Sequence, residues 1–118
     1  LNILLSGSLL ANYKTTINKL KIKPLIEQIN NFSYINIAVI VKEIRIIKTK
    51  KKQNMAILQV QDDTSSIEVV VFPRTYNEYQ KLLIKDKALL IYGRFKNESE
   101  LSFISEKITI LEEDKWKN

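Results

Sequence analysis

The chain has 118 residues, 45% of them hydrophobic, which suits one domain with a modest core. It contains no Cys and no His, which excludes disulfides, zinc fingers and imidazole catalysis, and its net charge is +6. No apolar run is long enough to span a bilayer, and no basic-then-apolar signal segment opens the sequence, so we expect a soluble cytoplasmic protein. Because the sequence starts at Leu1, within an apolar run, we expect it to be a piece of a longer protein.

The positive charge is concentrated in the first half of the chain. Residues 1–59 hold ten Lys or Arg and two acids, a net charge of +8, whereas residues 60–118 carry a net charge of −2. The thirteen residues 42–54 alone carry +5. Such a concentration suits a polyanionic partner, although a lysine run is also typical of a solvated loop.

Two short helices are predicted before the first strand. Apolar residues recur at mostly three- and four-residue spacing over residues 6–20, which indicates an amphipathic helix. Pro24 suits the first turn of a second helix, because its missing N–H costs nothing there. The predicted buried side of this second helix comprises Leu25, Ile26 and Ile29. We assign residues 1–34 to a helical lead-in segment.

Residues 35–48 are predicted to form a long first strand. Its apolar residues follow one phase as far as Val41 and the other phase from Ile44, so the alternation slips between these positions. A β-bulge at this point would bend the strand and let it serve both sides of a small barrel. Residues 48–54 are predicted to form the loop that follows.

Residues 55–72 predict a β-hairpin. Ala56, Leu58 and Val60 alternate with their neighbours at the period of two typical of a half-buried strand, and a β-rich run resumes at Ile67. The residues between the two runs, 62–66, are Asp, Thr and Ser, which bond to their own backbone and favour turns.

A helix and two more strands follow the hairpin. Pro73 starts the predicted helix, which ends near Lys85 and turns Tyr76, Tyr79, Leu82 and Leu83 toward one end of a barrel. The strands cover residues 88–95 and 101–110. Gly93 within a strand indicates a tight bend or a close backbone approach, whereas Phe95 and Phe103 share the phase of the core residues.

The sequence resembles a known domain over roughly residues 35–111. TKKKQNMAILQVQDDTSSIEVVVFP, followed by YNEYQKLLIKDKALLIYGRF, is similar to the OB domain of the bacterial DNA polymerase III alpha subunit. Strand, strand, strand, helix, strand, strand is also the OB order. We therefore predict a mainly β fold: a five-stranded Greek-key OB-fold barrel at residues 35–111, with a helix between strands 3 and 4, preceded by two short N-terminal helices and followed by a polar tail at residues 112–118.

Candidate nucleic-acid-binding residues fall into three groups. Four lysines lie between the first two strands, where OB domains commonly grip nucleic acid: Lys48, Lys50, Lys51 and Lys52. Three residues sit on strand phases facing away from the apolar set, where they suit phosphates and base edges or an ordinary solvated face: Arg45, Gln59 and Gln61. Tyr92 is the remaining stacking candidate, since Ile57 stands where the resembling family often has Phe; an interface tyrosine is the alternative.

Three further features bear on the turn after residue 61 and on the C-terminal tail. Asp62 and Asp63 are adjacent, so on a strand they would point to opposite sides, and turn formation accounts for them better than a metal site. Ser65 stands in this turn where the family often has Gly, so the turn either avoids positive φ or is mildly strained. Trp116 suits a stacking residue, an anchor to a neighbouring domain or an unstructured remnant.

The resemblance implies a role in DNA replication. The fragment itself holds no catalytic residue and no cofactor; the parent chain would be a DNA-directed DNA polymerase whose carboxylates and Mg²⁺ lie in other domains. The module would hold single-stranded template DNA near the active site, in a replisome at the bacterial nucleoid, with other polymerase domains, the sliding clamp and the clamp loader as partners. A protein-docking or structural module and a tRNA anticodon-binding OB domain stay open, because fold alone does not settle function.

Overall fold

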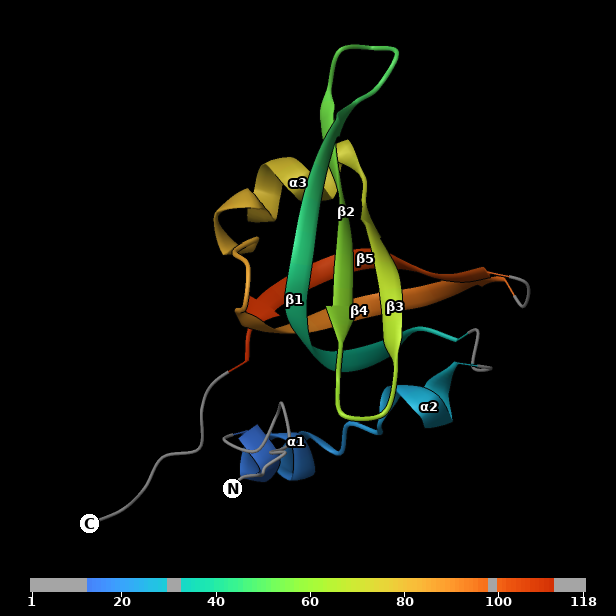
Figure 1. Ribbon diagram of the computed structural model, residues 1–118, viewed down its shortest axis with the longest axis vertical. Helices are drawn as coiled ribbons and strands as arrows, with labels where there is room; N and C mark the ends of the chain where they lie inside the picture. Colours follow the sequence, from blue (N-terminus) through green and yellow to red (C-terminus); the bar gives the residue numbers. More distant parts are fainter. Residues whose placement is uncertain (1–12, 30–32, 98–99, 112–118) are drawn as a thin grey trace.

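Five strands close into a barrel in the computed structural model, which describes residues 13–29, 33–97 and 100–111 (Figure 1). The barrel order is β1-β2-β3-β5-β4. Neighbouring strands are antiparallel, except that β3 and β5 are parallel. The strands are β1 (Ile35–Lys48), β2 (Asn54–Gln61), β3 (Ser66–Val71), β4 (Ala88–Asn97) and β5 (Glu100–Ile110). The predicted five-stranded barrel, with its helix between strands 3 and 4, is confirmed.

Strand β1 bends so that it belongs to two walls of the barrel. Its first half pairs with β4, from Ile35 opposite Gly93 onward, and its second half pairs with β2 as far as Lys48 opposite Asn54. The register with β2 shifts between Val41 and Glu43. The bulge predicted from the slip in alternation is therefore present, and it lets one long strand close the barrel.

The inward-facing residues of all five strands form the main core. The largest fully buried side chains include Phe95 and Phe103, whose rings meet edge to face with centroids 5.2 Å apart. Gly93 is buried where the antiparallel pairing of β4 with β5 shifts register, and a Cβ atom added there would collide with the Ile104 carbonyl group. The predicted core phenylalanines and the close backbone approach at the glycine are both confirmed.

The helix after β3 covers part of this core. It consists of α3 (Pro73–Tyr79) and the 3₁₀ turn η2 (Gln80–Leu82), so it ends three residues before the predicted Lys85. It ends early because Leu83 already leaves helical geometry and Asp86 takes a positive φ of 67° ahead of β4. Its predicted apolar side is confirmed, since Tyr76, Tyr79, Leu82 and Leu83 pack against the core.

The lead-in chain packs on the outside of the barrel. α1 (Lys14–Leu20) and the residues around it form a second apolar cluster, with Tyr13, Ile17 and Ile22 against Ala38, Ala88 and Leu111. The predicted helix began at residue 6, but residues 1–12 lie outside the described part. α2 (Leu25–Gln28) buries Leu25 and leaves Ile26 58% exposed, so the prediction that Ile26 is buried is wrong. Pro24 is the N-cap of this helix, one residue before its first turn.

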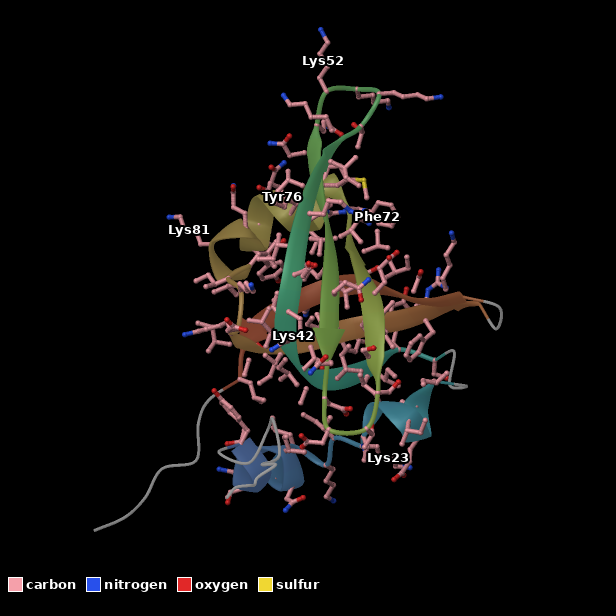
Figure 2. The ribbon with its side chains drawn as sticks, viewed as in Figure 1. Lys23, Lys42, Lys52, Phe72, Tyr76 and Lys81 are labelled. Atoms are coloured by element: carbon pink, nitrogen blue, oxygen red, sulfur yellow. The ribbon has the colours of Figure 1, made fainter. Side chains whose placement is uncertain are left out.

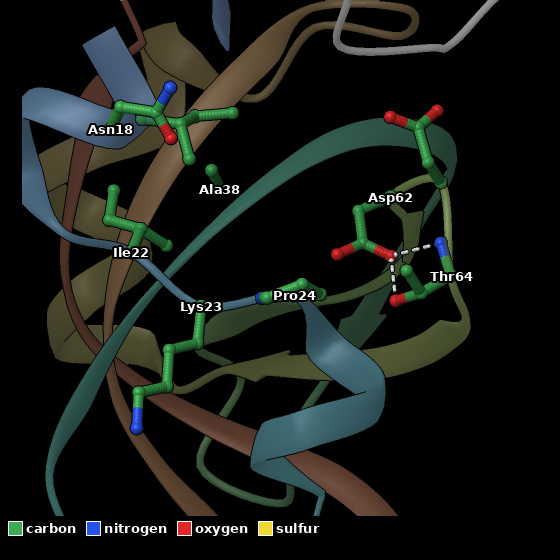
Figure 3. Close-up of a pocket in the computed structure, with 9 residues that line it drawn as sticks. Asn18, Ile22, Lys23, Pro24, Ala38, Asp62 and Thr64 are labelled. Carbon is green, nitrogen blue, oxygen red and sulfur yellow. Dashed lines mark hydrogen bonds between the residues drawn. The ribbon is translucent and has the colours of Figure 1, made fainter. Parts of the chain in front are cut away.

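Asp62 links the lead-in to the barrel. Its Oδ2 accepts a hydrogen bond from the Leu25 backbone N–H at 2.8 Å, and its Oδ1 accepts bonds from Thr64 N–H, the Thr64 hydroxyl and Ser65 N–H at 2.7 to 3.0 Å. Figure 3 shows the Thr64 bonds beside a hollow of about 270 Å³ between the lead-in and the β2–β3 turn. The predicted turn role is confirmed. Ser65 is not among the described non-glycine residues with positive φ, so this turn does without glycine.

Candidate nucleic-acid interface

The ends of β1 and β2 extend beyond the barrel as a hairpin, here called the lysine arm (residues 46–55), with its turn at residues 49–53 (Figure 1). The turn is shorter than the predicted loop, because Lys48 still pairs with Asn54. The Thr49 N–H donates to the Gln53 carbonyl at 2.8 Å, and the Thr49 carbonyl accepts from the Lys52 N–H at 2.9 Å. The Thr49 hydroxyl accepts from the Gln53 N–H at 3.2 Å. This compact turn therefore fixes the backbone that carries the lysines.

All four predicted lysines of the arm are exposed: Lys48, Lys50, Lys51 and Lys52. Figure 2 shows Lys52 pointing away from the tip, and its φ of 63° places it in the left-handed region. Residues 48–54 contain no acid, so nothing within the turn neutralises these charges. Lys42, farther down β1, instead faces Asp86, with Nζ 3.5 Å from Oδ1. The tip is thus a strongly positive point at one end of the molecule.

Arg45, Gln59 and Gln61 lie on the outer face of β1, β2 and β3, as predicted. Along β2, Gln59 and Gln61 alternate with Ala56, Leu58 and Val60, which are fully buried. In the ladder Arg45 lies opposite Ile57, and Gln59 lies between Glu43 and Glu68. A hollow of about 440 Å³ between β1 and β2 is lined by Glu43, Ile44, Arg45, Ile57 and Gln59. Gln61 is half-buried and lies farther along β2, opposite Ser66.

Charge is divided along this outer face. The lysine tip lies at one end, whereas Glu43 and Glu68 flank Gln59 and the pair Asp62 and Asp63 follows at the β2–β3 turn. Like charges repel, so a phosphate is favoured near the arm and disfavoured toward the turn. Figure 1 shows the arm and the lead-in helices at opposite ends of the barrel.

Phe72 is an exposed aromatic on this face that the sequence reasoning did not single out. It follows β3 directly with extended backbone, and because Ile67, Val69 and Val71 point inward, Phe72 points outward, with 47% of its surface exposed. Figure 2 shows it beside the upper ends of the strands, toward the arm. The alternation that predicts the inward side of β3 also predicts that Phe72 points outward.

Tyr92 does not join the other candidates. It lies on β4, opposite Asn36 and Lys107, and the neighbours of β4 in the barrel are β5 and the first half of β1. Its ring stacks on Tyr34, with centroids 5.6 Å apart and planes 21° from parallel, and the Arg94 guanidinium carbon lies 5.9 Å from the Tyr34 centroid. The structure therefore places Tyr92 in a separate aromatic site on another wall.

A second hollow, of about 430 Å³, lies beside this aromatic site and reaches α3. Its lining includes Tyr34, Tyr92, Tyr79, Arg74 and Lys107, together with Glu78 and Glu106. Partial burial raises the pKa of the Tyr79 phenol, and the charge of Glu78 and its hydrogen bond with the phenol raise this pKa further.

Residues 13–29, 33–97 and 100–111 contain neither a metal-binding cluster nor a membrane-spanning helix. No group of three or more His, Cys, Asp or Glu side chains in this part is arranged to hold a metal ion. No helix in it is both long and apolar enough to cross a membrane. Trp116 lies outside the described residues.

The chain is similar to the alpha subunits of bacterial DNA polymerase III. DNA polymerase III subunit alpha of Bacillus subtilis (strain 168) is 30% identical over 80 residues, which is 67% of this chain and 7% of that protein. The Buchnera aphidicola subunit is 38% identical over 72 residues, 61% of this chain and 6% of its own length. The Aquifex aeolicus subunit is 30% identical over 95 residues, 79% of this chain and 8% of its own. The chain thus spans less than a tenth of each of these relatives.

The structural and family comparisons agree on the fold. The mitochondrial single-stranded DNA binding protein Rim1 of S. cerevisiae superimposes with a TM-score of 0.56 at 13% identity, covering 71% of this chain and 99% of that one. The family model described as OB-fold nucleic acid binding domain matches residues 35–111, the whole barrel. The chain therefore belongs to the OB-fold nucleic-acid-binding domain family.

Proposed function

We propose that this chain is the single-stranded DNA-binding OB domain of a replicative DNA polymerase III alpha subunit, and that it holds template near the active site. The observation that carries the proposal is the lysine arm, with three exposed lysines on a hydrogen-bonded turn and Lys48 at the end of β1, beside an open sheet face. The similarity to proteins named DNA polymerase III subunit alpha supports the proposal that the parent protein is such a subunit. In this proposal nucleotidyl transfer and its Mg²⁺ belong to other domains of the parent polymerase.

The lysine arm would act on the backbone of the DNA. Lysine ammonium groups neutralise phosphates whatever the base sequence, which suits a replicase that must copy any template. Four phosphate contacts predict a slope of log affinity against log salt of about −3, at roughly −0.7 per single-strand phosphate. Arg45 would hold a further phosphate, Gln59 would bond to a base edge, and Phe72 would stack on an unpaired base.

The test is fluorescence anisotropy of labelled single-stranded and duplex DNA over a range of salt concentrations. The main variant changes Lys50, Lys51 and Lys52 together to Glu. The matched control makes the same charge change at Lys81, Lys85 and Lys87, exposed residues in η2 and the turn before β4. Figure 2 shows Lys81 on a different side of the barrel from Lys52.

We expect the wild type to prefer single strands and to weaken steeply with salt. The arm variant should lose most of its affinity for single-stranded DNA, and its slope of log affinity against log salt should be shallower by about 2. The control variant should change much less in both quantities. Equal affinity of the arm variant and the wild type would contradict the charge-based mechanism.

A protein-docking module within the replisome is the second candidate. It is favoured by two apolar side chains on the arm, Ile46 and Ile47, which are 48% and 39% exposed. Absence of DNA binding at low salt, together with a salt-insensitive complex with the sliding clamp, the clamp loader or another polymerase domain, would support this role. A preference for RNA over DNA in the same titration would instead favour an anticodon-binding role.

A further inference from the structure

Two stacked aromatic rings, Tyr34 and Tyr92, lie outside the hydrophobic core beside β4. Neither Tyr34 nor Tyr92 belongs to the two apolar clusters of the described residues. Tyr92 and Arg94 are two residues apart on β4, so they project from the same side of the strand, and both approach Tyr34. Half of the Tyr34 surface, 51%, remains exposed to solvent. Tyr34 is therefore a half-exposed aromatic ring that contacts both Tyr92 and Arg94.

We infer that Tyr34, held by Tyr92 and Arg94, is a second contact for the same DNA strand, at which one unpaired base stacks on the exposed Tyr34 ring. This inference rests on the proposed function. A nucleobase is a flat ring that stacks on aromatic side chains whatever its identity. Duplex DNA keeps its bases stacked on one another, so the site admits single strands.

The charges around this Tyr34 site explain how it differs from the arm. The hollow beside it is lined by Arg74 and Lys107, but also by Glu78 and Glu106, so among the described residues the charges of the hollow balance and Arg94 at the Tyr34 ring is the one excess cation. Glu78 is already engaged by the Tyr79 phenol. One excess cation concentrates phosphates much less than the lysines of the arm, so the contribution of the Tyr34 ring comes from stacking and depends little on salt. The arm and the Tyr34 site thus have separable signatures in one titration.

The occupant reaches this site only if the strand is long enough. OB folds cover roughly 4 to 16 nucleotides. The Tyr34 site and the lysine arm lie at opposite ends of the bent β1, since Tyr34 immediately precedes β1 and Lys48 ends it. A strand of about 4 nucleotides bound at the arm falls short of Tyr34, whereas one of about 16 spans both.

The experiment measures affinities of about 4-nucleotide and 16-nucleotide single strands for the wild type, Tyr34→Ala and Tyr34→Phe. We expect Tyr34→Ala to bind the long strand about tenfold more weakly, as loss of one base stack predicts, with the salt slope and the short-strand affinity unchanged. Tyr34→Phe retains the ring and should bind like the wild type. Far-UV circular dichroism confirms that both variants are folded.

Two results overturn the inference while leaving the proposed function standing. One is wild-type affinity of Tyr34→Ala for both strands. The other is an equal loss of affinity for both strands together with a changed salt dependence. That result would mean that Tyr34→Ala disturbs the structure of the lysine arm and does not remove a separate contact. By contrast, failure of the wild type to bind either strand at low salt overturns the proposed function itself.

Discussion

Replacing Asp62 tests the link between the lead-in and the barrel. This carboxylate is 9% exposed and accepts four hydrogen bonds, three within the β2–β3 turn and one from the Leu25 N–H, 37 residues away. Leu25 itself is buried, so in Asp62→Ala its N–H loses its partner in a place that water reaches poorly. The turn donors at Thr64 and Ser65 are nearer the surface and can bond to water.

The cost of Asp62→Ala follows from these two environments. An unsatisfied buried N–H costs about 1–3 kcal/mol, and loss of the turn bonds costs about 1 kcal/mol. We expect a free energy of unfolding lower by about 3 kcal/mol, within the roughly 5–15 kcal/mol that small domains have. Asp62→Asn keeps an acceptor for the turn but turns an amide N–H toward Leu25, so about 1–2 kcal/mol should be lost.

Urea denaturation followed by far-UV circular dichroism measures both losses. With a slope of about 1.5 kcal/mol per molar, Asp62→Ala should unfold at roughly 2 M less urea, with the slope unchanged. The control is Glu27→Gln, which makes the same charge change at an exposed carboxylate of α2 and should stay within about 0.5 kcal/mol of the wild type. If Asp62→Asn matched Glu27→Gln, the bond to Leu25 would not stabilise the fold.

Three further predictions concern the core, a phenol and the sheet face. Gly93→Ala places a methyl group against the Ile104 backbone and 2.9 Å from Phe103 Cε2, so we expect a loss of about 3 kcal/mol in urea denaturation; a neutral result would mean that β4 and β5 separate freely. Because the pKa of Tyr79 is raised, the contribution of its phenol to stability is present below about pH 10 and is lost as pH rises through the folded pKa. Ultraviolet titration should show one tyrosine that ionises at higher pH than usual, and this late step should be missing in Tyr79→Phe. Phe72→Ala should weaken single-strand binding at least fivefold at every salt concentration, while Phe72→Tyr should not.

Much of the barrel follows from local alternation in the sequence. The slip between Val41 and Ile44 predicts the bulge, and the residues that share a phase on β2 and β3 are the ones that the barrel buries. Gly93 predicts a close approach without naming its partner. These features are visible because strand alternation records which side of the sheet is covered.

The contacts between distant segments could not be predicted in this way. The bond from Leu25 to Asp62 depends on where the lead-in folds back, and the Tyr34 stack depends on the register that places Ile35 opposite Gly93. The sequence makes Tyr92 a stacking candidate, but strand alternation does not say which wall of the barrel its strand occupies. Phe72 was available from alternation alone, since it follows the inward Val71.

The bulged, protruding form of β1 makes the distance from the lysines to the barrel adjustable. The Thr49–Gln53 turn closes on itself, and the strands below it leave the core before they reach it. Adding two residues to each strand would carry the lysines about 7 Å farther out while every side chain keeps its face. Adding one residue to each strand would instead move the side chains beyond the insertion to the opposite face of the hairpin. Insertions of two residues per strand would therefore lengthen the lysine arm without changing the barrel that carries it.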